Sequence, residues 1–171
     1  IMNIIEKQGN LLVPSTYLNE EDLNRELNII HGCNAQGIMG AGLALQVRNK
    51  SEEVYQVYKQ ACDTKTNDKQ SLLGTITFKR LSPDPITIIN AIIQLETGVH
   101  KRQVNYEAVA QVFDRIATTI LNHPNTQFTL AIPKYFGSAL AGGNWNIIRT
   151  IIEESLNKFS NVNLYIVEYK K

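Results

Sequence analysis

The chain has little cysteine and no long apolar run, and both absences narrow what it can be. Cys33 and Cys62 are its two cysteines, too few for a disulfide framework or a four-ligand zinc site, so we expect a reducing, cytoplasmic location. No apolar stretch approaches the roughly 20 residues of a membrane span, and the start, IMNIIEKQGN, lacks the basic and apolar regions of a signal peptide. No spacing of Asp, Glu or His suggests a metal site.

A dominant charge of one sign is also missing. The 17 basic and 16 acidic side chains leave a formal net charge of +1, so no strong field attracts the protein to nucleic acid or to an anionic membrane. Any anion that it binds must therefore be captured locally. The 171 residues fit one domain. Ile1 precedes Met2 and is set aside, so we expect a single domain over residues 2–171 that acts as a monomer.

Short β-branched runs alternate with helical patterns along the chain. A helical pattern is clearest over residues 106–121, where apolar side chains recur at three- and four-residue steps, and the same repeat predicts a helix over 145–159. A third helix is predicted to begin at Ser51, because Glu52 and Glu53 are acids in its first turn, where the helix dipole favours them. The alternation predicts an α/β fold with a mostly parallel sheet, apart from one antiparallel hairpin around the turn at 82–85. The expected strands cover residues 3–6, 27–31, 74–78, 86–94, 127–133 and 162–168.

Two glycine-rich segments each follow a predicted strand and precede a predicted helix. The first covers residues 31–43 (HGCNAQGIMGAGL), and the second covers residues 133–145 (PKYFGSALAGGNW). In an open α/β sheet such segments lie at the carboxyl ends of the strands, where ligands bind. Glycines let the backbone approach a phosphate closely, and N–H groups at a helix N-terminus attract anions. Two such loops predict a diphosphate held from two sides; the alternative is that the glycines only form tight turns and helix caps.

Two familiar phosphate-binding motifs are excluded by their missing residues. The first segment has the glycine spacing of a Walker A loop, but Leu43 and Ala44 stand where the lysine and the Ser or Thr are required. Gly40 and Gly42 fit the start of a Rossmann fingerprint, but Leu45 occupies the position of its third glycine. The loops therefore belong to neither class.

The segments resemble the macro domain family, the α/β module that binds ADP-ribose. The likeness rests on residues 8–12 (QGNLL), the 31–43 segment and residues 137–145, which come in the family's order, and the ending 166–169 (IVEY) resembles its last strand. Within the family the chain is similar to the branch that contains ADP-ribose 1″-phosphate phosphatase and the hydrolases that remove ADP-ribose from acidic side chains or nucleic acid. The resemblance implies a three-layer αβα fold with a mixed, mostly parallel central sheet.

The resemblance also implies which residues bind the ligand. Asn10 stands where most macro domains have an aspartate that accepts a hydrogen bond from the adenine amino group, and an asparagine oxygen can accept the same bond. Asn34 would hold the distal ribose, and Tyr169 would pack on adenine or be a plain strand-end aromatic. The other implied binding residues surround the phosphates and riboses: Gly9, Leu11, Gly37, Met39, Gly40, Ala41, Gly42, Leu43, Phe136, Gly137, Ser138, Ala139, Leu140, Ala141 and Gly142.

His31 and Asn34 are the catalytic residues that the resemblance implies. An imidazole near the distal phosphate could deprotonate water or protonate the leaving ribose oxygen; the alternative is a structural histidine at a strand end. Cys33 would share a face with His31 on a continuing strand, and it could act as a nucleophile, although free cysteine is more often buried packing.

The expected reaction is hydrolysis of ADP-ribose 1″-phosphate to ADP-ribose and phosphate, without a cofactor or metal. Hydrolases of the family that act on glutamate-linked ADP-ribose use an aspartate where Ala141 stands here, and a lysine for which Lys101 and Arg102 are imperfect matches. This departure argues against that reaction. Removal of ADP-ribose from protein or nucleic acid, and non-catalytic reading of ADP-ribose, stay as alternatives. Nucleic acid is an expected partner only where it carries ADP-ribose.

Overall fold

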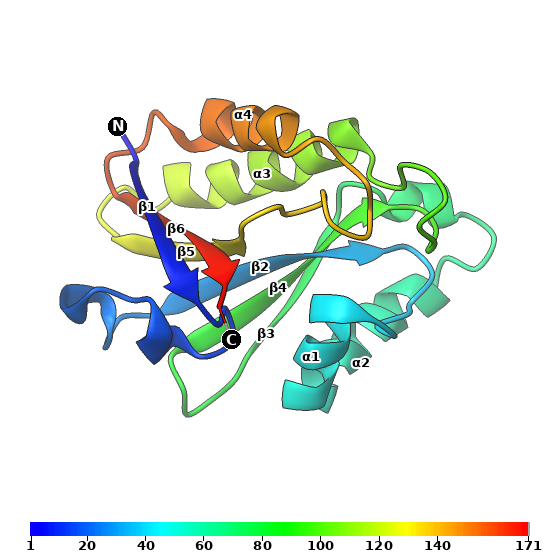
Figure 1. The fold of residues 1–171 in the computed structure, drawn as a ribbon, viewed down its shortest axis with the longest axis horizontal. Coiled ribbons are helices and arrows are strands. Elements are labelled where there is room, and N and C mark those ends of the chain that lie inside the picture. Colours follow the sequence, from blue (N-terminus) through cyan, green and yellow to red (C-terminus); the bar gives the residue numbers. More distant parts are fainter. Residues whose placement is uncertain (171) are drawn as a thin grey trace.

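The computed structural model describes residues 1–170 and has three layers, with a sheet between two pairs of helices (Figure 1). The helices α3 and α4 cover one face of the sheet, and α1 and α2 cover part of the other. The strands are β1 (Asn3–Gly9), β2 (Leu27–Asn34), β3 (Ile76–Arg80), β4 (Ile86–Gln94), β5 (Phe128–Pro133) and β6 (Val162–Tyr169). The helices are α1 (Gly42–Lys50), α2 (Glu52–Asp63), α3 (Tyr106–Leu121) and α4 (Trp145–Leu156), with short 3-10 turns η1 (Pro14–Thr16), η2 (Glu20–Asp22) and η3 (Lys69–Leu72).

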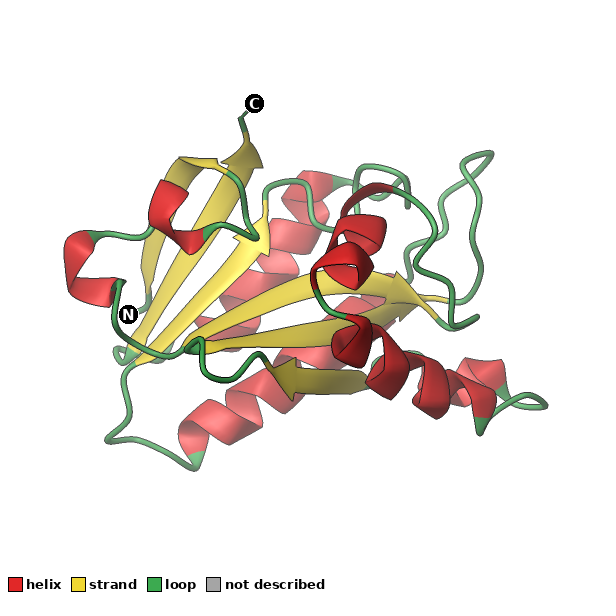
Figure 2. Cartoon of the chain, turned by 90° about the horizontal axis from the view of Figure 1, so that it is seen from below, coloured by secondary structure: helices red, strands yellow, loops and turns green. Residues whose placement is uncertain are grey.

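The sheet has the strand order β1-β6-β5-β2-β4-β3. All neighbouring strands are parallel except β3 and β4, which form the antiparallel hairpin predicted around residues 82–85. Figure 2 shows the twisted sheet with its helices on both sides. The predicted three-layer fold with a mixed, mostly parallel sheet is confirmed. Because five strands run in parallel, their carboxyl ends and the loops that follow lie at one edge of the sheet.

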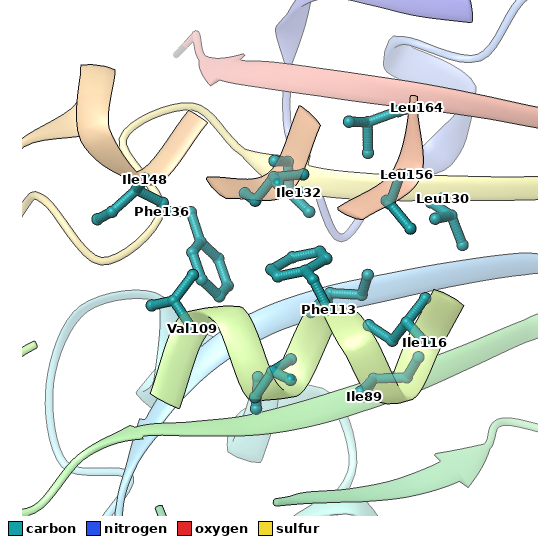
Figure 3. Close-up of a cluster of buried hydrophobic side chains, with 14 of the residues drawn as sticks. Ile89, Val109, Phe113, Ile116, Leu130, Ile132, Phe136, Ile148, Leu156 and Leu164 are labelled. Carbon is teal, nitrogen blue, oxygen red and sulfur yellow. The ribbon is translucent and has the colours of Figure 1, made fainter. Parts of the chain in front are cut away.

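Two apolar cores form because successive strand residues point to opposite faces of the sheet. Ile30 packs toward α3 and α4, whereas Ile29 and Cys33 pack toward α1 and α2. In the first core, the rings of Phe113 and Phe136 meet edge to face, with centroids 5.9 Å apart (Figure 3). Phe136 is therefore part of the core, although the sequence resemblance implied that it contacts ligand.

Side-chain caps begin three of the four α-helices. Ser51, Asn105 and Asn144 each accept a hydrogen bond from a backbone N–H of the first turn of α2, α3 and α4, the usual way of pairing these N–H groups. At the start of α1 the corresponding residue is Ala41, which has no side-chain acceptor. None of the helices within residues 1–170 is long and apolar enough to cross a membrane.

Candidate functional site

The two glycine-rich loops meet at the carboxyl edge of the sheet. Loop 1 (residues 35–41) joins β2 to α1, and loop 2 (residues 134–144) joins β5 to α4. A Cβ atom placed on Gly42, directly after loop 1, would lie 3.2 Å from Cδ1 of Leu140 in loop 2. Leu140 is also 55% exposed. The structure therefore brings together the two segments that the sequence indicated as a pair, with an exposed apolar side chain of one loop lying against the backbone of the other.

Loop 1 and the start of α1 present a run of unpaired backbone donors. Within residues 1–170, the N–H groups of residues 39–44 have no hydrogen-bond acceptor in the protein. The first turn of α1 contains no acidic residue, so nothing there competes with an anion for the positive end of the helix. Gly42 has φ +57°, a left-handed conformation that favours glycine. This arrangement can bind an anionic group such as a phosphate.

Loop 2 is attached to the segment between β4 and α3. The N–H groups of Gln103 and Val104 donate to the carbonyl of Ala141 at 2.8 and 3.2 Å. A Cβ atom placed on Gly142, which has φ +72°, would lie 3.3 Å from Cα of Arg102. The backbone of Lys101 and Arg102, which form a basic cluster with His100, therefore packs against loop 2.

Some of the loop 2 donors that the resemblance implied are available and one is not. In the described part of the chain, the N–H groups of Ala139, Leu140 and Ala141 have no acceptor within the protein. The N–H of Ser138 donates to the carbonyl of Tyr135 at 2.7 Å. Ser138 therefore closes a turn with its backbone N–H, and that group is not free for a diphosphate.

Asn34 is committed to the shape of loop 1. Its Oδ1 accepts from the N–H of Gln36 at 2.9 Å, and its Nδ2 donates to the carbonyl of Ile38 at 2.8 Å. The Tyr58 hydroxyl lies 2.8 Å from the same Oδ1. The side chain is 8% exposed. In this structure Asn34 organises the loop, and one N–H of its NH₂ group is left for a further acceptor.

His31 lies beneath α2, away from the exposed loop backbone. Its Nε2 is 2.6 Å from Oδ1 of Asn90 on β4, and its side chain is 1% exposed. The Nδ2 of Asn90 donates to the carbonyl of Val54 and to Oγ1 of Thr77, which fixes Oδ1 as the acceptor and Nε2–H as the donor. Burial lowers the pKa of His31 to about 4, although the Asn90 bond opposes the shift. The ring is therefore neutral at pH 7 and shielded from water, which argues against the acid–base role that the sequence suggested.

Cys33 lies beside His31 and is equally enclosed. Its Sγ is 3.7 Å from Nε2 of His31, so the two residues share a face as the strand pattern predicted. Burial raises the pKa of the Cys33 thiol, with a smaller contribution from nearby Cys62. A thiolate is therefore disfavoured, and the geometry gives no support to Cys33 as a nucleophile. Within residues 1–170, no three His, Cys, Asp or Glu side chains could hold a metal ion.

The ends of β1 and β6 place Asn10 and Tyr169 next to each other. Gly9 pairs with Tyr169 in the parallel register of these strands, and Tyr169 is 63% exposed. The Oδ1 of Asn10 accepts from the N–H of Leu12 at 3.0 Å, so the amide presents its NH₂ group to other partners. The oxygen keeps one further lone pair, so the expectation that it receives the adenine amino group stays a prediction.

Several implied binding residues are enclosed in the cores. Leu11, Met39 and Phe136 are buried, so they support the loops from below. Sequence reasoning missed Tyr135, an exposed residue with φ +69° whose ring lies 6.2 Å from that of Trp145. The only available signal for Tyr135 was an aromatic residue directly before the loop glycines.

Two surface hollows lie away from these loops. One of about 480 Å³ lies between α3 and α4 and is lined in part by Asp114 and Lys158. The other, of about 300 Å³, lies beside α2 and is lined in part by Gln56 and Lys79. No residue predicted for the site lines either hollow. These two hollows therefore give no support to a ligand site away from loops 1 and 2.

Comparison with known proteins relates part of the sequence to an enzyme. No family model matches the chain. ADP-ribose 1″-phosphate phosphatase from Scheffersomyces stipitis is 42% identical over 45 residues. The match spans 26% of this chain and 26% of that relative, about a quarter of each.

Comparison with solved structures extends over nearly the whole chain. The macrodomain of Thermus aquaticus DarG has a TM-score of 0.71 and 22% identity, covering 99% of both chains. A macrodomain protein from Streptomyces coelicolor has a TM-score of 0.72 at 22% identity, again covering 99% of both. Thermosipho africanus DarTG in complex with ADP-ribose has a TM-score of 0.65 at 18% identity, covering 82% of this chain and 37% of that one. The chain therefore has the macrodomain fold that its sequence resemblance predicted.

Proposed function

We propose that the chain binds ADP-ribose or ADP-ribose 1″-phosphate, with the diphosphate between loops 1 and 2. The observation that carries the proposal is the unpaired N–H run of residues 39–44, which lies where Leu140 of loop 2 contacts Gly42. Amide donors in this arrangement bind phosphate without a metal. The solved DarTG structure with ADP-ribose, which shares the fold, gives independent support for this ligand class.

The strand order supports one orientation of the ligand. Because β1, β6, β5, β2 and β4 are successive neighbours, the strand ends form a row along the edge of the sheet. The adenosine end would lie near Asn10 and Tyr169 on β1 and β6, and the diphosphate would lie between the loops after β5 and β2. The distal ribose would then point toward residues 95–105, the segment that carries Lys101 and Arg102.

As the activity, we propose hydrolysis of the 1″-phosphate to give ADP-ribose and inorganic phosphate. The partial relative of that name supports it, as does the backbone of Lys101 and Arg102, which packs against Gly142 of loop 2. Backbone amides directed at a phosphate stabilise charge that develops during its transfer. The proposal gives no proton-transfer step to His31, because its buried ring has a pKa lowered to about 4.

Non-catalytic reading of ADP-ribose is the second candidate function. The observation that favours it is the commitment of Asn34 and His31 to partners inside the protein. The His31 ring is buried, with its pKa lowered to about 4, and so is not placed to move protons at the loops in this structure. A reader would keep every binding element and release no phosphate.

Two measurements on the same protein test both parts of the proposal. Calorimetry should show ADP-ribose binding with a dissociation constant of about 1 μM, equivalent to roughly −8 kcal/mol, and much weaker binding of AMP, which lacks the diphosphate. Release of phosphate from ADP-ribose 1″-phosphate then separates the enzyme from the reader. Binding of AMP within a few-fold of ADP-ribose would contradict the two-loop site, and binding without phosphate release would leave only the reader.

A further inference from the structure

One face of α2 is directed at loop 1 through two tyrosine hydroxyls. Tyr58 is fully buried, and its hydroxyl lies 2.7 Å from the main-chain oxygen of Asn34 and 2.8 Å from Oδ1 of Asn34. The same hydroxyl accepts from the N–H of Ile38 at 3.1 Å. One turn earlier, the Tyr55 hydroxyl donates to the carbonyl of Gly37 at 3.1 Å. The two side chains therefore contact Asn34, directly before loop 1, and the middle of the loop at Gly37 and Ile38.

We propose that Tyr58, assisted by Tyr55, is a positioning residue that sets loop 1 in its anion-binding conformation. The loop contains no regular structure, so backbone bonds alone do not fix its shape. Tyr58 joins Asn34 at the end of β2 to Ile38, which directly precedes the unpaired N–H groups of residues 39–44. This inference rests on the proposed function, and it adds residues of α2 that make no contact with ligand.

The chemistry of these hydroxyls suits a permanent structural link. Burial raises the pKa of Tyr58, so the hydroxyl stays protonated and can donate and accept at once. Tyr55 is held in turn by Arg48 of α1, whose guanidinium carbon lies 3.8 Å from the ring centroid. The helix α1, whose N-terminus is part of the site, is thus connected to the same tyrosine that contacts Gly37.

The variant Tyr58→Phe tests the proposal because it removes the hydroxyl and keeps the ring. Tyr165→Phe is the matched control: Tyr165 is also fully buried, and its hydroxyl accepts from the N–H of Asn19 and donates to Asp22, away from loop 1. Both variants should lose stability. Only Tyr58→Phe should weaken ADP-ribose binding, by about tenfold, the size of one lost hydrogen bond. Tyr55→Phe should have a smaller effect.

Hydrogen exchange gives a readout that does not depend on the ligand. In Tyr58→Phe the amides of Gln36 and Ile38 should exchange faster than in the unmodified protein, and in Tyr165→Phe they should not. Unchanged exchange of these amides in Tyr58→Phe would overturn the positioning role, as would equal affinity losses in the two variants. If the unmodified protein bound no ADP-ribose, the proposed function would fail, and the exchange experiment would still decide whether Tyr58 orders the loop.

Discussion

The ring of His31 donates its Nε2–H to Oδ1 of Asn90 at 2.6 Å, which joins β2 to β4 in the core beneath α2. The Nδ2 of Asn90 donates to the carbonyl of Val54 and to Oγ1 of Thr77. The atom that faces His31 is therefore the oxygen, Oδ1. A buried polar pair of this kind is costly to break, since the remaining partner is left without a hydrogen bond. In this structure the histidine that the sequence suggested as catalytic links two neighbouring strands.

Replacing His31 should destabilise the fold without a direct effect on binding. His31→Ala leaves a cavity and an unpaired Asn90 oxygen, so the free energy of unfolding should fall by about 2–4 kcal/mol. Denaturant unfolding measures the change, and calorimetry at a temperature where the variant is folded should give near-normal ADP-ribose affinity. The control His123→Ala removes an exposed histidine at the end of α3 and should cost less than about 1 kcal/mol. A fully stable His31→Ala variant would contradict this interpretation.

The buried histidine also predicts how stability depends on pH. Its folded pKa is lowered from 6.5 to about 4, so the unfolded chain takes up the proton first as the pH falls. The contribution of His31 is complete above pH 6.5 and is lost as the pH falls toward 4, by up to about 3 kcal/mol. In His31→Gln this part of the dependence should disappear. Equal slopes of unfolding free energy against pH in both proteins would count against a neutral, buried His31.

Much of the fold could be predicted because local pattern and tertiary position agree. Residues 86–94 and 106–121 were predicted with the bounds of β4 and α3, since a continuous β-branched run and a clear apolar stripe each mark one element. The helix α1 was not delimited, because Val47 is its one buried residue and no stripe forms. The strand β2 continues past the predicted end at His31 to Asn34, since Gly32 and Cys33 still pair with β4.

The site was predictable as a pair of loops and not as a set of side-chain roles. Glycine spacing identifies backbone that can approach a phosphate, and this depends on local sequence alone. Whether Asn34 and His31 are available depends on Tyr58 and Asn90, which lie far away in the chain and carry no signal of that contact. Asn10 differs, because its oxygen accepts from a backbone N–H only two residues later, which is a local contact.

A side chain on Gly40 should block the ligand and leave the fold intact. A Cβ atom there meets only Cγ2 of Ile38 at 3.5 Å, and Gly40 has no positive φ, so Gly40→Val adds bulk on the exposed side of the unpaired N–H run without backbone strain. We expect at least a tenfold loss of ADP-ribose affinity with an unchanged unfolding transition. Gly42→Val differs because Gly42 has φ +57°, so it should lose both affinity and stability. Normal binding by Gly40→Val would show that the ligand lies elsewhere.

Asn10→Asp should increase affinity for adenine-containing ligand. The Asn10 oxygen already accepts from the Leu12 N–H and keeps one lone pair for another donor, whereas the NH₂ group can only donate and is unfavourable beside the adenine amino group. An aspartate can accept from Leu12 with one oxygen and from adenine with the other. Calorimetry should show several-fold tighter binding of ADP-ribose, in line with a charge-assisted hydrogen bond. The analogue with hypoxanthine in place of adenine should instead bind more tightly to the unmodified protein than to Asn10→Asp. If the substitution changed the affinity for both ligands equally, base recognition by Asn10 would be excluded.

Lys101 and Arg102 should distinguish ADP-ribose 1″-phosphate from ADP-ribose. The segment that carries them is bonded to Ala141 of loop 2, and the proposed orientation directs the distal ribose toward it. The extra phosphate adds negative charge near two cations, so the double variant Lys101→Ala and Arg102→Ala should weaken binding of the 1″-phosphate several-fold more than binding of ADP-ribose. Because both side chains are exposed, the difference should shrink at high salt. Lys158→Ala, which removes one exposed cation after α4 and away from the loops, is the control and should affect neither ligand. An equal loss for both ligands would place the distal phosphate away from this cluster.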